Sequence, residues 1–411
     1  MFMKYIKFLF LIHFLLSVDN HTVYSQKLTI EDAVFIALEN NQDIKTAKIN
    51  VAKEEAIVVK SFNIPKPQLF IEFEGVKGSI NNFESRKIGV SQDLEFPSVY
   101  FFRANVQNSQ VNIAKMELNK LAYQIRYEVE SAYLKVVLNN ELLKIAKENL
   151  KLYDDFLYVA GKKYEAGSAS NLEVLGAKVS KIKYENQVKS LESEIVNSKS
   201  ELRKLLNVSY FEYENLDGLS YKPFFINKDD IMNLTIKNNP ALKIIKYKKE
   251  KFNNKLSLSK SEFLPSLSFK YYKQKIGSEN DFWGVEFGIG IPLWFWWEQT
   301  GNIKESSYEI DISHSEESSM KNSLTNEVNI FFEEYLNSTR EVQFFNDEAL
   351  FESNEILRQS KISYEEGAID YVEYLQSLQL VYETKSQYVN SLYNYNNSII
   401  KLKNLIAGEF K

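Results

Sequence analysis

The side chains that most often carry covalent or metal chemistry are scarce in this chain of 411 residues. It contains no cysteine and three histidines, of which His13 and His21 lie in its apolar start. Only His314 remains, which excludes thiolate chemistry, histidine-cluster metal sites and most histidine-based catalysis. No nucleophile is paired with a base, and the carboxylates lie among lysines, as is typical of solvated helix faces. The sequence therefore predicts neither an enzyme nor a bound cofactor.

The first residues have the pattern of a cleaved export signal. Lys4 and Lys7 precede an apolar run that is too short to span a bilayer, and Val23 and Ser25 occupy the small-residue positions before a cleavage site. We therefore expect residues 1–25 to be removed, with a membrane anchor as the alternative. The formal net charge is −5 and no basic patch stands out, so nothing indicates a nucleic-acid partner.

A second group of charged side chains alternates with apolar ones in two segments, 65–97 and 265–301. These segments hold five of the seven prolines and eight of the fourteen glycines. The alternation predicts strands with one apolar and one polar face, and each segment reads as one hairpin with a polar tip, "GVKGSINNFES" or "QKIGSENDF". The charged residues assigned to the polar face are Glu72, Glu74, Asp93, Glu95, Lys270 and Glu286.

Four strands with two unlike faces cannot close a barrel alone, because the smallest membrane barrels have eight strands. We therefore expect an oligomer in which each chain contributes four strands. Rings of acidic side chains on the inner face of such a pore would raise the local concentration of cations and repel anions. The polar-face carboxylates are thus predicted to line a lumen that favours cations.

All four tryptophans lie close together in the chain, at Trp283, Trp294, Trp296 and Trp297. The alternation predicts a fourth strand that starts at Trp283 and ends at Trp294. Such a strand rises roughly 28 Å when tilted, the height of an outer-membrane apolar band whose edges carry aromatic girdles. We therefore expect these tryptophans to contact outer-membrane lipid; a buried aromatic cluster is the alternative.

Two long segments, 98–160 and 302–366, contain neither glycine nor proline. Each would be about 95 Å long if helical, far longer than an ordinary globular helix. In the first, apolar residues recur every seven positions, and a second apolar row lies beside them. Two rows indicate a helix that packs on two neighbours, as in a wall of helices. The first row is Val129, Val136, Leu143, Leu150 and Leu157, and the second includes Leu138, Leu142 and Ile145.

The chain carries an internal duplication. The stretch "YEAGSASNLEVL" from Tyr164 matches "YEEGAIDYVEYL" from Tyr364 at an offset of 200, and "ALENNQDIKTAKI" resembles "TIKNNPALKIIKY" at an offset of 198. Each half reads as a short helix, a medium helix, two strands, a very long helix, a glycine-bearing turn and a medium helix. Gly167 and Gly367 are expected in those turns, because a glycine just past a helix end usually adopts the left-handed backbone.

The duplication sets the expected domain boundaries. We expect a first repeat over 26–206 with strands at about 67–97, an irregular connector over 207–227, and a second repeat over 228–411 with strands at about 265–292. The predicted fold is mostly α, with long coiled-coil helices and a transmembrane β part.

With these features in place, the chain resembles the TolC family of outer-membrane efflux channels. The matching elements are the opening "LTIEDAVFIALENNQDIKTAKI", its copy "KDDIMNLTIKNNPALKIIKY", the two hairpins and the paired glycine motifs. The resemblance covers essentially the whole mature chain. It implies a homotrimer in which a twelve-stranded outer-membrane β-barrel continues into a periplasmic α-barrel, and partnership with a periplasmic adaptor and an inner-membrane pump.

The resemblance also implies roles for residues at the glycine motifs. Tyr164, Gly167, Tyr364 and Gly367 fall at the periplasmic tip turns, where the family contacts its adaptor. Glu373 falls where the family often has an aspartate that lines the closed aperture, and Glu173 is its counterpart in the first repeat. Three positions after Glu373 the family often has a second aspartate, but this chain has Gln376. The resemblance therefore does not extend to a second ring of carboxylates. In the family, a Gly-Lys-Arg element often follows the second strand. In this chain Arg103 is the only basic counterpart of that element.

The functional hypothesis is a passive outer-membrane channel for small molecules, drugs or metal cations. A structural coiled-coil protein of the periplasm or cell surface, without channel activity, is the alternative, and the four amphipathic strands count against it. With no cysteine and a single mature histidine, the sequence shows no relay for soft metals. It does not identify the cargo.

Overall fold

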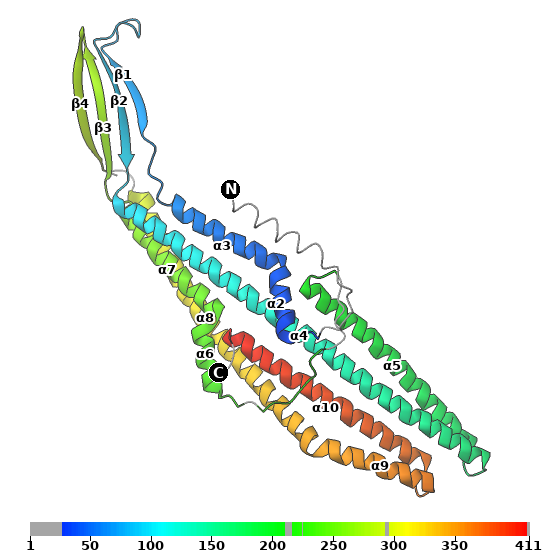
Figure 1. Cartoon of the computed structure of the whole chain (residues 1–411). Helices are drawn as coiled ribbons and strands as arrows, with labels where there is room; N and C mark the ends of the chain where they lie inside the picture. The colour runs from blue at the N-terminus through cyan, green and yellow to red at the C-terminus, as the bar shows by residue number, and fades with distance from the viewer. Residues whose placement is uncertain (1–26, 210–215, 224, 292–295, 409–411) are drawn as a thin grey trace, which may run out of the picture. The chain divides into compact units, whose positions relative to one another are not determined.

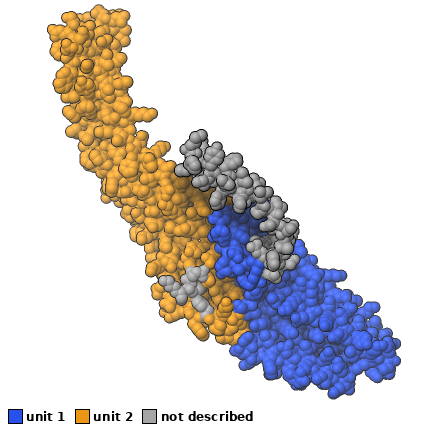
Figure 2. Space-filling model, viewed as in Figure 1, with its two compact units in different colours: residues 1–40, 129–220, 345–393 blue, residues 41–128, 221–344, 394–411 orange. Residues whose placement is uncertain are grey.

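The computed structural model describes residues 27–209, 216–223, 225–291 and 296–408. The expected export signal and Trp294 lie outside these residues. The chain divides into two compact units, drawn in blue and orange in Figure 2. Unit 1 comprises residues 1–40, 129–220 and 345–393, and unit 2 comprises residues 41–128, 221–344 and 394–411. Each unit therefore takes segments from both repeats.

The order of elements along the chain confirms the duplicated pattern (Figure 1). The first repeat contains α2 (Ile30–Asn40), α3 (Gln42–Lys60), β1 (Gln68–Glu74), β2 (Ser85–Leu94), α4 (Pro97–Glu165) and α5 (Asn171–Leu206). The second contains α6 (Lys228–Asn238), α7 (Pro240–Ser261), β3 (Ser266–Ile276), β4 (Glu279–Gly290), α8 (Trp296–Phe344), the π-helical turn η1 (Phe345–Ala349), α9 (Leu350–Glu366) and α10 (Tyr371–Ile406).

The second long helix is interrupted, which corrects the expectation of one helix over 302–366. Whereas α4 runs unbroken for 69 residues, its counterpart ends at Phe344, passes through η1 and resumes as α9 at Leu350. A π-helical turn accommodates an extra residue without a glycine or proline. The composition of this stretch therefore gave no sign of the break.

The second hairpin tip is also shorter than expected. Residues Gly277 and Ser278 alone separate β3 from β4, whereas the sequence predicts a tip of nine residues, "QKIGSENDF". Gly277 has φ +58°, the left-handed conformation that two-residue hairpin turns require. The first tip, residues 75–84, is one residue shorter than the expected "GVKGSINNFES", because Ser85 begins β2.

Paired asparagines start the helices that precede each hairpin. The Asn41 side chain accepts from the backbone N–H of Ile44 at 3.0 Å and caps α3, while Asn239 accepts from Ala241 at 2.9 Å and caps α7. Pro240 occupies the first turn of α7, where a missing N–H costs nothing. Each cap stabilises its helix by about 1 kcal/mol, which gives the repeated Asn-Asn a local structural reason.

Within unit 1, the two apolar rows of α4 pack on two different helices, as the sequence predicts. In the first row, Leu143 and Leu150 pack against the cluster that Val188 and Leu191 of α5 form with Ala146. In the second, Leu138 and Ile145 pack with Val389 of α10. Each such side chain contributes about 1.5–3 kcal/mol when fully buried.

One polar residue, Asn139, interrupts the row of Ile125, Ala132, Ala146 and Tyr153 on α4 without being left unsatisfied. Its amide donates to the Glu194 carbonyl oxygen at 3.3 Å and to Ser198 Oγ at 3.2 Å, both on α5. Because a buried amide can be satisfied at only a few positions along a neighbouring helix, this contact favours one register of α4 against α5.

Within unit 2, the strands form one antiparallel sheet in the order β1-β2-β3-β4. The pairing places Ile71 opposite Ile88, Val90 opposite Tyr271, and Lys270 opposite Glu286. In the described chain, β1 and β4 each have a partner on one side only, so both outer edges of the sheet carry unpaired backbone groups.

Candidate functional site

One face of the sheet is apolar and open to its surroundings. Residues that pair directly across strands share a face, which places the odd-numbered residues of β1, β3 and, from Trp283 onward, β4 with the even-numbered residues of β2. On this apolar face Leu69 is 86% and Phe287 is 78% exposed. The other exposed apolar members are Ile71, Ile88, Val90, Leu267, Phe269, Tyr271, Trp283, Val285 and Ile289. A contiguous apolar surface of this size marks a membrane or protein interface.

The opposite, polar face carries the charges that the sequence places there. Lys87 lies between two carboxylates of β1, with its Nζ 2.6 Å from Glu74 and 3.5 Å from Glu72. Lys270 Nζ lies 3.0 Å from Glu286. Asp93 shares this face through its pairing with Ser268.

Sequence reasoning missed Lys87, although the alternation that places Asp93 on the polar face also places Lys87 there. Glu279 joins this face through its pairing with Ile276 across the β-bulge. Five carboxylates against two lysines leave the face with a net charge of −3 per chain, counting Glu72, Glu74, Lys87, Asp93, Lys270, Glu279 and Glu286.

Glu95 differs from the other predicted lumen residues. It follows the end of β2 at Leu94, so strand alternation does not assign it to a face. Its carboxylate instead binds Arg103 of α4 through two hydrogen bonds of 2.8 Å. This pair raises the pKa of Arg103, while burial, together with the charges of Glu95 and Glu298, raises the pKa of nearby Glu262. Arg103 thus joins the end of the strand to the start of the helix.

The positions of the tryptophans agree only in part with the hypothesis of aromatic girdles at the membrane edges. Trp283 lies inside β4, opposite Lys273, rather than at the strand's start, because β4 begins earlier at Glu279. Trp296 is the first residue of α8, and Trp297 follows it with 84% of its surface exposed. An aromatic ring so exposed does not form part of a core within this chain.

Unit 1 carries the two glycine turns, each built as a Schellman motif. In the first, Ser168 N–H donates to the Lys163 carbonyl at 2.7 Å, and in the second Ala368 N–H donates to Ser363 at 2.7 Å. Gly167 and Gly367 have φ of +73° and +79°. Nothing lies within 4 Å of where a Cβ would stand on either glycine. The left-handed backbone alone therefore explains why glycine suits both positions.

Replacing Gly167 or Gly367 by alanine is expected to destabilise its turn by about 1–2 kcal/mol, because a Cβ is strained in left-handed backbone. Asparagine should cost less, since its side chain tolerates this conformation. Gly161→Ala provides a control of opposite sign: Gly161 lies in the body of α4, where alanine is favoured by about 0.5–1 kcal/mol. Amide hydrogen exchange at residues 163–172 and 363–372 measures the effect. Equal exchange in all three alanine variants would remove the conformational explanation.

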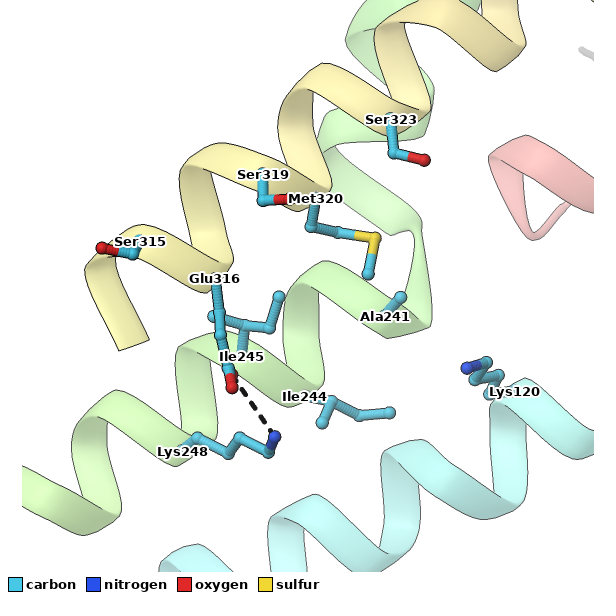
Figure 3. Close-up of a pocket in the computed structure, with 10 residues that line it drawn as sticks. All are labelled: Lys120, Ala241, Ile244, Ile245, Lys248, Ser315, Glu316, Ser319, Met320 and Ser323. Atoms are coloured by element: carbon cyan, nitrogen blue, oxygen red, sulfur yellow. Dashed lines mark hydrogen bonds and ion pairs between the residues drawn. The ribbon is translucent and has the colours of Figure 1, made fainter. Parts of the chain in front are cut away.

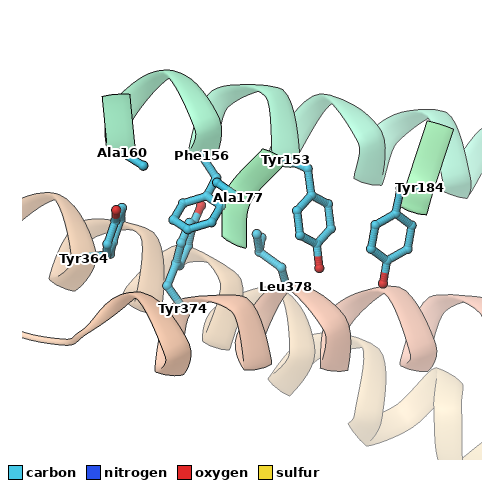
Figure 4. Close-up of a cluster of buried hydrophobic side chains, with 8 residues drawn as sticks. All are labelled: Tyr153, Phe156, Ala160, Ala177, Tyr184, Tyr364, Tyr374 and Leu378. Atoms are coloured by element: carbon cyan, nitrogen blue, oxygen red, sulfur yellow. The ribbon is translucent and has the colours of Figure 1, made fainter. Parts of the chain in front are cut away.

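The two tyrosines at the start of the repeated motif have different environments. Tyr164 is 49% exposed, whereas Tyr364 is 3% exposed in an aromatic cluster shown in Figure 4. The Tyr364 ring stacks on Tyr374 with centroids 4.9 Å apart and meets Phe156 edge-on at 5.4 Å. The amine of Lys163 lies 4.1 Å from the centroid of the Tyr364 ring and also donates to the Tyr364 carbonyl oxygen.

The two glutamates at equivalent positions of the repeats, Glu173 and Glu373, also differ in burial and in hydrogen bonding. Glu173 is buried and accepts a hydrogen bond from the Tyr364 hydroxyl. Burial, reinforced by that contact, raises the pKa of Tyr364, so its hydroxyl keeps the proton it donates. Glu373 is exposed in the first turn of α10, where its backbone N–H donates to Asp370 at 2.9 Å. Of the two residues that the resemblance assigns to an aperture, only Glu373 leaves its carboxylate free to meet solvent or an ion.

Unit 2 also contains a hollow of about 690 Å³ between α7, α8 and Lys120 of α4. Lys248 and Glu316 form an ion pair of 3.4 Å at one side of it. Figure 3 shows Ser315 and Ser323 pointing away from one another on α8. The polar groups do not converge on one point, so the hollow lacks the geometry of a ligand site.

No group of three or more histidine, aspartate or glutamate side chains in the described part of the chain is arranged to hold a metal ion. Among the same residues, no helix is both long and apolar enough to cross a membrane.

Helical hairpins joined to a four-stranded sheet with one exposed apolar face define the fold of an outer-membrane channel protein. Solved structures share it. The CusC structure, described as showing transmembrane channel formation, matches with a TM-score of 0.75 and 17% identity over 92% of each chain. The outer membrane protein VceC of Vibrio cholerae matches with a TM-score of 0.75 and 13% identity over 93% of this chain and 97% of its own. The CmeC outer membrane channel of Campylobacter jejuni matches with a TM-score of 0.70 and 16% identity over 93% of this chain and 86% of its own.

The family model described as outer membrane efflux protein matches residues 35–208 and again residues 231–408. The chain therefore belongs to the outer membrane efflux protein family, and its fold is the TolC-like combination of helical barrel and β-barrel. It is an efflux channel of the outer membrane that extends into the periplasm. No curated protein matches the chain by sequence.

Proposed function

We propose that three copies of this chain close one channel whose lumen favours cations, and that the channel receives its cargo from a periplasmic adaptor and an inner-membrane pump. It acts as a passive duct and catalyses no reaction. The apolar face of the sheet contacts outer-membrane lipid, and the polar face lines the lumen. In three copies the charged groups of the polar face sum to −9, from −3 per chain.

The observation that carries the proposal is the sheet itself. Its two outer strands each have one unpaired edge, and its two faces differ in polarity over most of their length, from the helix end up to the cations at the hairpin end. In lipid, unpaired backbone groups cost several kcal/mol each, so the edges of β1 and β4 must find partners. Pairing β1 of one chain with β4 of the next satisfies both edges and closes the sheet.

Cysteine crosslinking tests this arrangement directly, because the chain contains no cysteine of its own. One cysteine introduced into β1 and one into β4, scanned over facing registers, should yield a covalent trimer with no larger species. The control pairs the same β1 cysteine with one on β2, which should give only an intrachain bond. Monomers and dimers alone, or a ladder beyond three chains, would contradict the trimer.

Single-channel recording of the purified protein in a salt gradient tests the lumen. We expect a reversal potential that indicates cation preference. Removing carboxylates from the polar face, as in Asp93→Asn with Glu286→Gln, should reduce that preference, because each acidic ring contributes to the field in the pore. Preference for anions in the unmodified channel would refute an acidic lumen.

We further propose that Glu373 lines the narrowest, periplasmic end of the channel. Three exposed carboxylates brought together there would repel one another or recruit a cation. Glu373→Gln is therefore expected to weaken block by a divalent cation such as Mg²⁺ in the same recordings. Glu173→Gln is the matched control, because its buried side chain is held by Tyr364 and should leave block unchanged. Block that persists in Glu373→Gln would remove this residue from the aperture.

A further inference from the structure

Three cations lie on the apolar face of the sheet, all at its hairpin end. Arg86 of β2 lies directly opposite Lys275 of β3, and Lys273, two residues before Lys275, shares the same face. The rows nearer the helices are apolar: Leu267 lies opposite Leu94 on one side and Ile289 on the other. Charge is therefore confined to one end of an otherwise apolar surface.

None of these three cations has an ion-pair partner among the described residues. The lysines of the polar face differ, since Lys87 and Lys270 are each paired with glutamate. Asp281 of β4 lies beside the register irregularity next to Lys275, yet no ion pair joins them. Like charges directly opposite one another destabilise a sheet, so the pair formed by Arg86 and Lys275 costs stability unless an anion joins it.

The same cations line an open hollow on this face. Its volume is about 660 Å³, and Arg86, Lys273 and Lys275 border it. The apolar side chains that complete the lining include Leu69, Ile88, Val90 and Tyr271. The site thus offers positive charge at one end and hydrocarbon contact at the other, which is complementary to a lipid with an anionic headgroup.

The position of the cations along the strands suits the headgroup level of the membrane. Leu267 and Lys275 are eight residues apart, about 26 Å along a strand and roughly 20 Å in height after tilting. The helices of this family extend into the periplasm, so the hairpin end of the sheet reaches the outer leaflet. The three cations therefore lie near the outer edge of the apolar band, which is about 25 Å tall in such barrels.

We propose that this hollow binds a phosphorylated glycolipid of the outer leaflet. A phosphate monoester on its sugar headgroup accepts hydrogen bonds from Arg86, Lys273 and Lys275, and its acyl chains lie along the apolar residues below. Arginine is suited to phosphate because its planar guanidinium donates two parallel hydrogen bonds. The inference rests on the proposed function in one respect, since it requires the apolar face to point outward into lipid.

The test uses the full chain purified in detergent, incubated with bisphosphorylated lipid A and analysed by native mass spectrometry. Lys273→Gln with Lys275→Gln is expected to lower retained lipid A at least tenfold, and adding Arg86→Gln should abolish it. The matched control is Lys87→Gln with Lys270→Gln, which makes the same change on the opposite face of neighbouring strands and should leave retention unchanged. The single variant Arg86→Lys should retain only part of the lipid A that the unmodified protein retains.

The lipid probes separate the possible sources of the anion. Dephosphorylated lipid A should not be retained by the unmodified protein. Millimolar inorganic phosphate should not displace bound lipid A, because the acyl chains hold the lipid in place. Equal retention of phosphatidylglycerol would overturn the assignment to a phosphorylated glycolipid. Equal loss in the polar-face control would overturn the site.

Channel recording distinguishes this result from failure of the proposed function. A trimer that conducts normally but shows no preference for lipid A would refute the lipid site alone. A protein that neither inserts nor conducts would refute the channel arrangement on which the site depends.

Discussion

Tyr364→Ala is expected to destabilise the aromatic cluster of unit 1 by about 3–5 kcal/mol, the range for truncating a buried aromatic side chain. The substitution removes a ring stacked on Tyr374 and in edge contact with Phe156. It also leaves the buried Glu173 without its hydrogen-bond donor. Since 1.4 kcal/mol corresponds to a factor of ten, local opening should become roughly 10²- to 4 × 10³-fold more frequent. Amide hydrogen exchange of the full chain over residues 171–184 and 371–378 measures this directly.

The duplication supplies a matched control for this variant. Tyr164 occupies the same place in the first repeat and is exposed, so Tyr164→Ala should change local stability by no more than about 0.5 kcal/mol. If the two alanine variants open equally often, the difference in burial between the repeats does not govern the stability of the turns.

Tyr364→Phe separates the hydroxyl from the ring. The stacked geometry survives, but the Glu173 carboxylate loses its partner, which is expected to cost about 1–3 kcal/mol. Replacing both groups, as in Tyr364→Phe with Glu173→Leu, should recover most of that loss, because no buried polar group then remains unpaired. A double variant as unstable as the sum of the two single variants would show that the hydrogen bond contributes nothing.

The sequence predicted the sheet well because its signal is local. Alternating side chains in β2 and β3 assign each residue to a face without any knowledge of tertiary structure. The glycine turns were predictable for the same reason, since a left-handed residue that ends a helix needs only the neighbouring backbone. The two apolar rows of α4 likewise follow from the helical repeat and predicted that this helix packs on two neighbours.

What the sequence did not predict depends on contacts between distant segments. Tyr164 and Tyr364 begin the same motif, and only the packing of α10 against α4 determines which one is buried. The break at η1 follows no glycine or proline and arises inside a helical pattern. The pairing of Glu95 with Arg103 depends on how β2 meets α4, which alternation cannot describe. These residues differ from expectation because their roles are set after the local elements have formed.

Gly89→Ala is expected to disrupt the centre of the sheet, although the change adds a single methyl group. A Cβ on Gly89 would lie 2.3 Å from the Tyr271 carbonyl oxygen and 2.7 Å from Tyr272 Cβ. The carbonyl belongs to the ladder between β2 and β3, so it cannot move without loss of backbone pairing. Overpacking of this kind costs about 1–3 kcal/mol, occasionally more, and a closed oligomeric barrel repeats the cost in every chain.

Tyr272 explains a second glycine on the same face. It lies opposite Gly89 on one side and Gly284 on the other, and a Cβ on Gly284 would lie 2.6 Å from Cζ of its ring. The Tyr272 ring therefore occupies the space that a side chain at residue 284 would take. Gly284→Ala should be destabilising as long as that ring is present, because the two groups compete for one volume.

The two glycines are expected to respond differently to removal of the ring. Tyr272→Ala should rescue Gly284→Ala, whose clash is with the ring, but not Gly89→Ala, whose clash is with backbone and Cβ. Gly288→Ala serves as the control on the same face, since its nearest neighbour is Ser268 Oγ at 2.4 Å, the end of a side chain that can rotate away. The readouts are folded protein recovered from outer membranes and hydrogen exchange over residues 85–94 and 266–276. Rescue of both glycine variants by Tyr272→Ala, or normal assembly of Gly89→Ala alone, would show that the contact between β2 and β3 is looser than its geometry indicates.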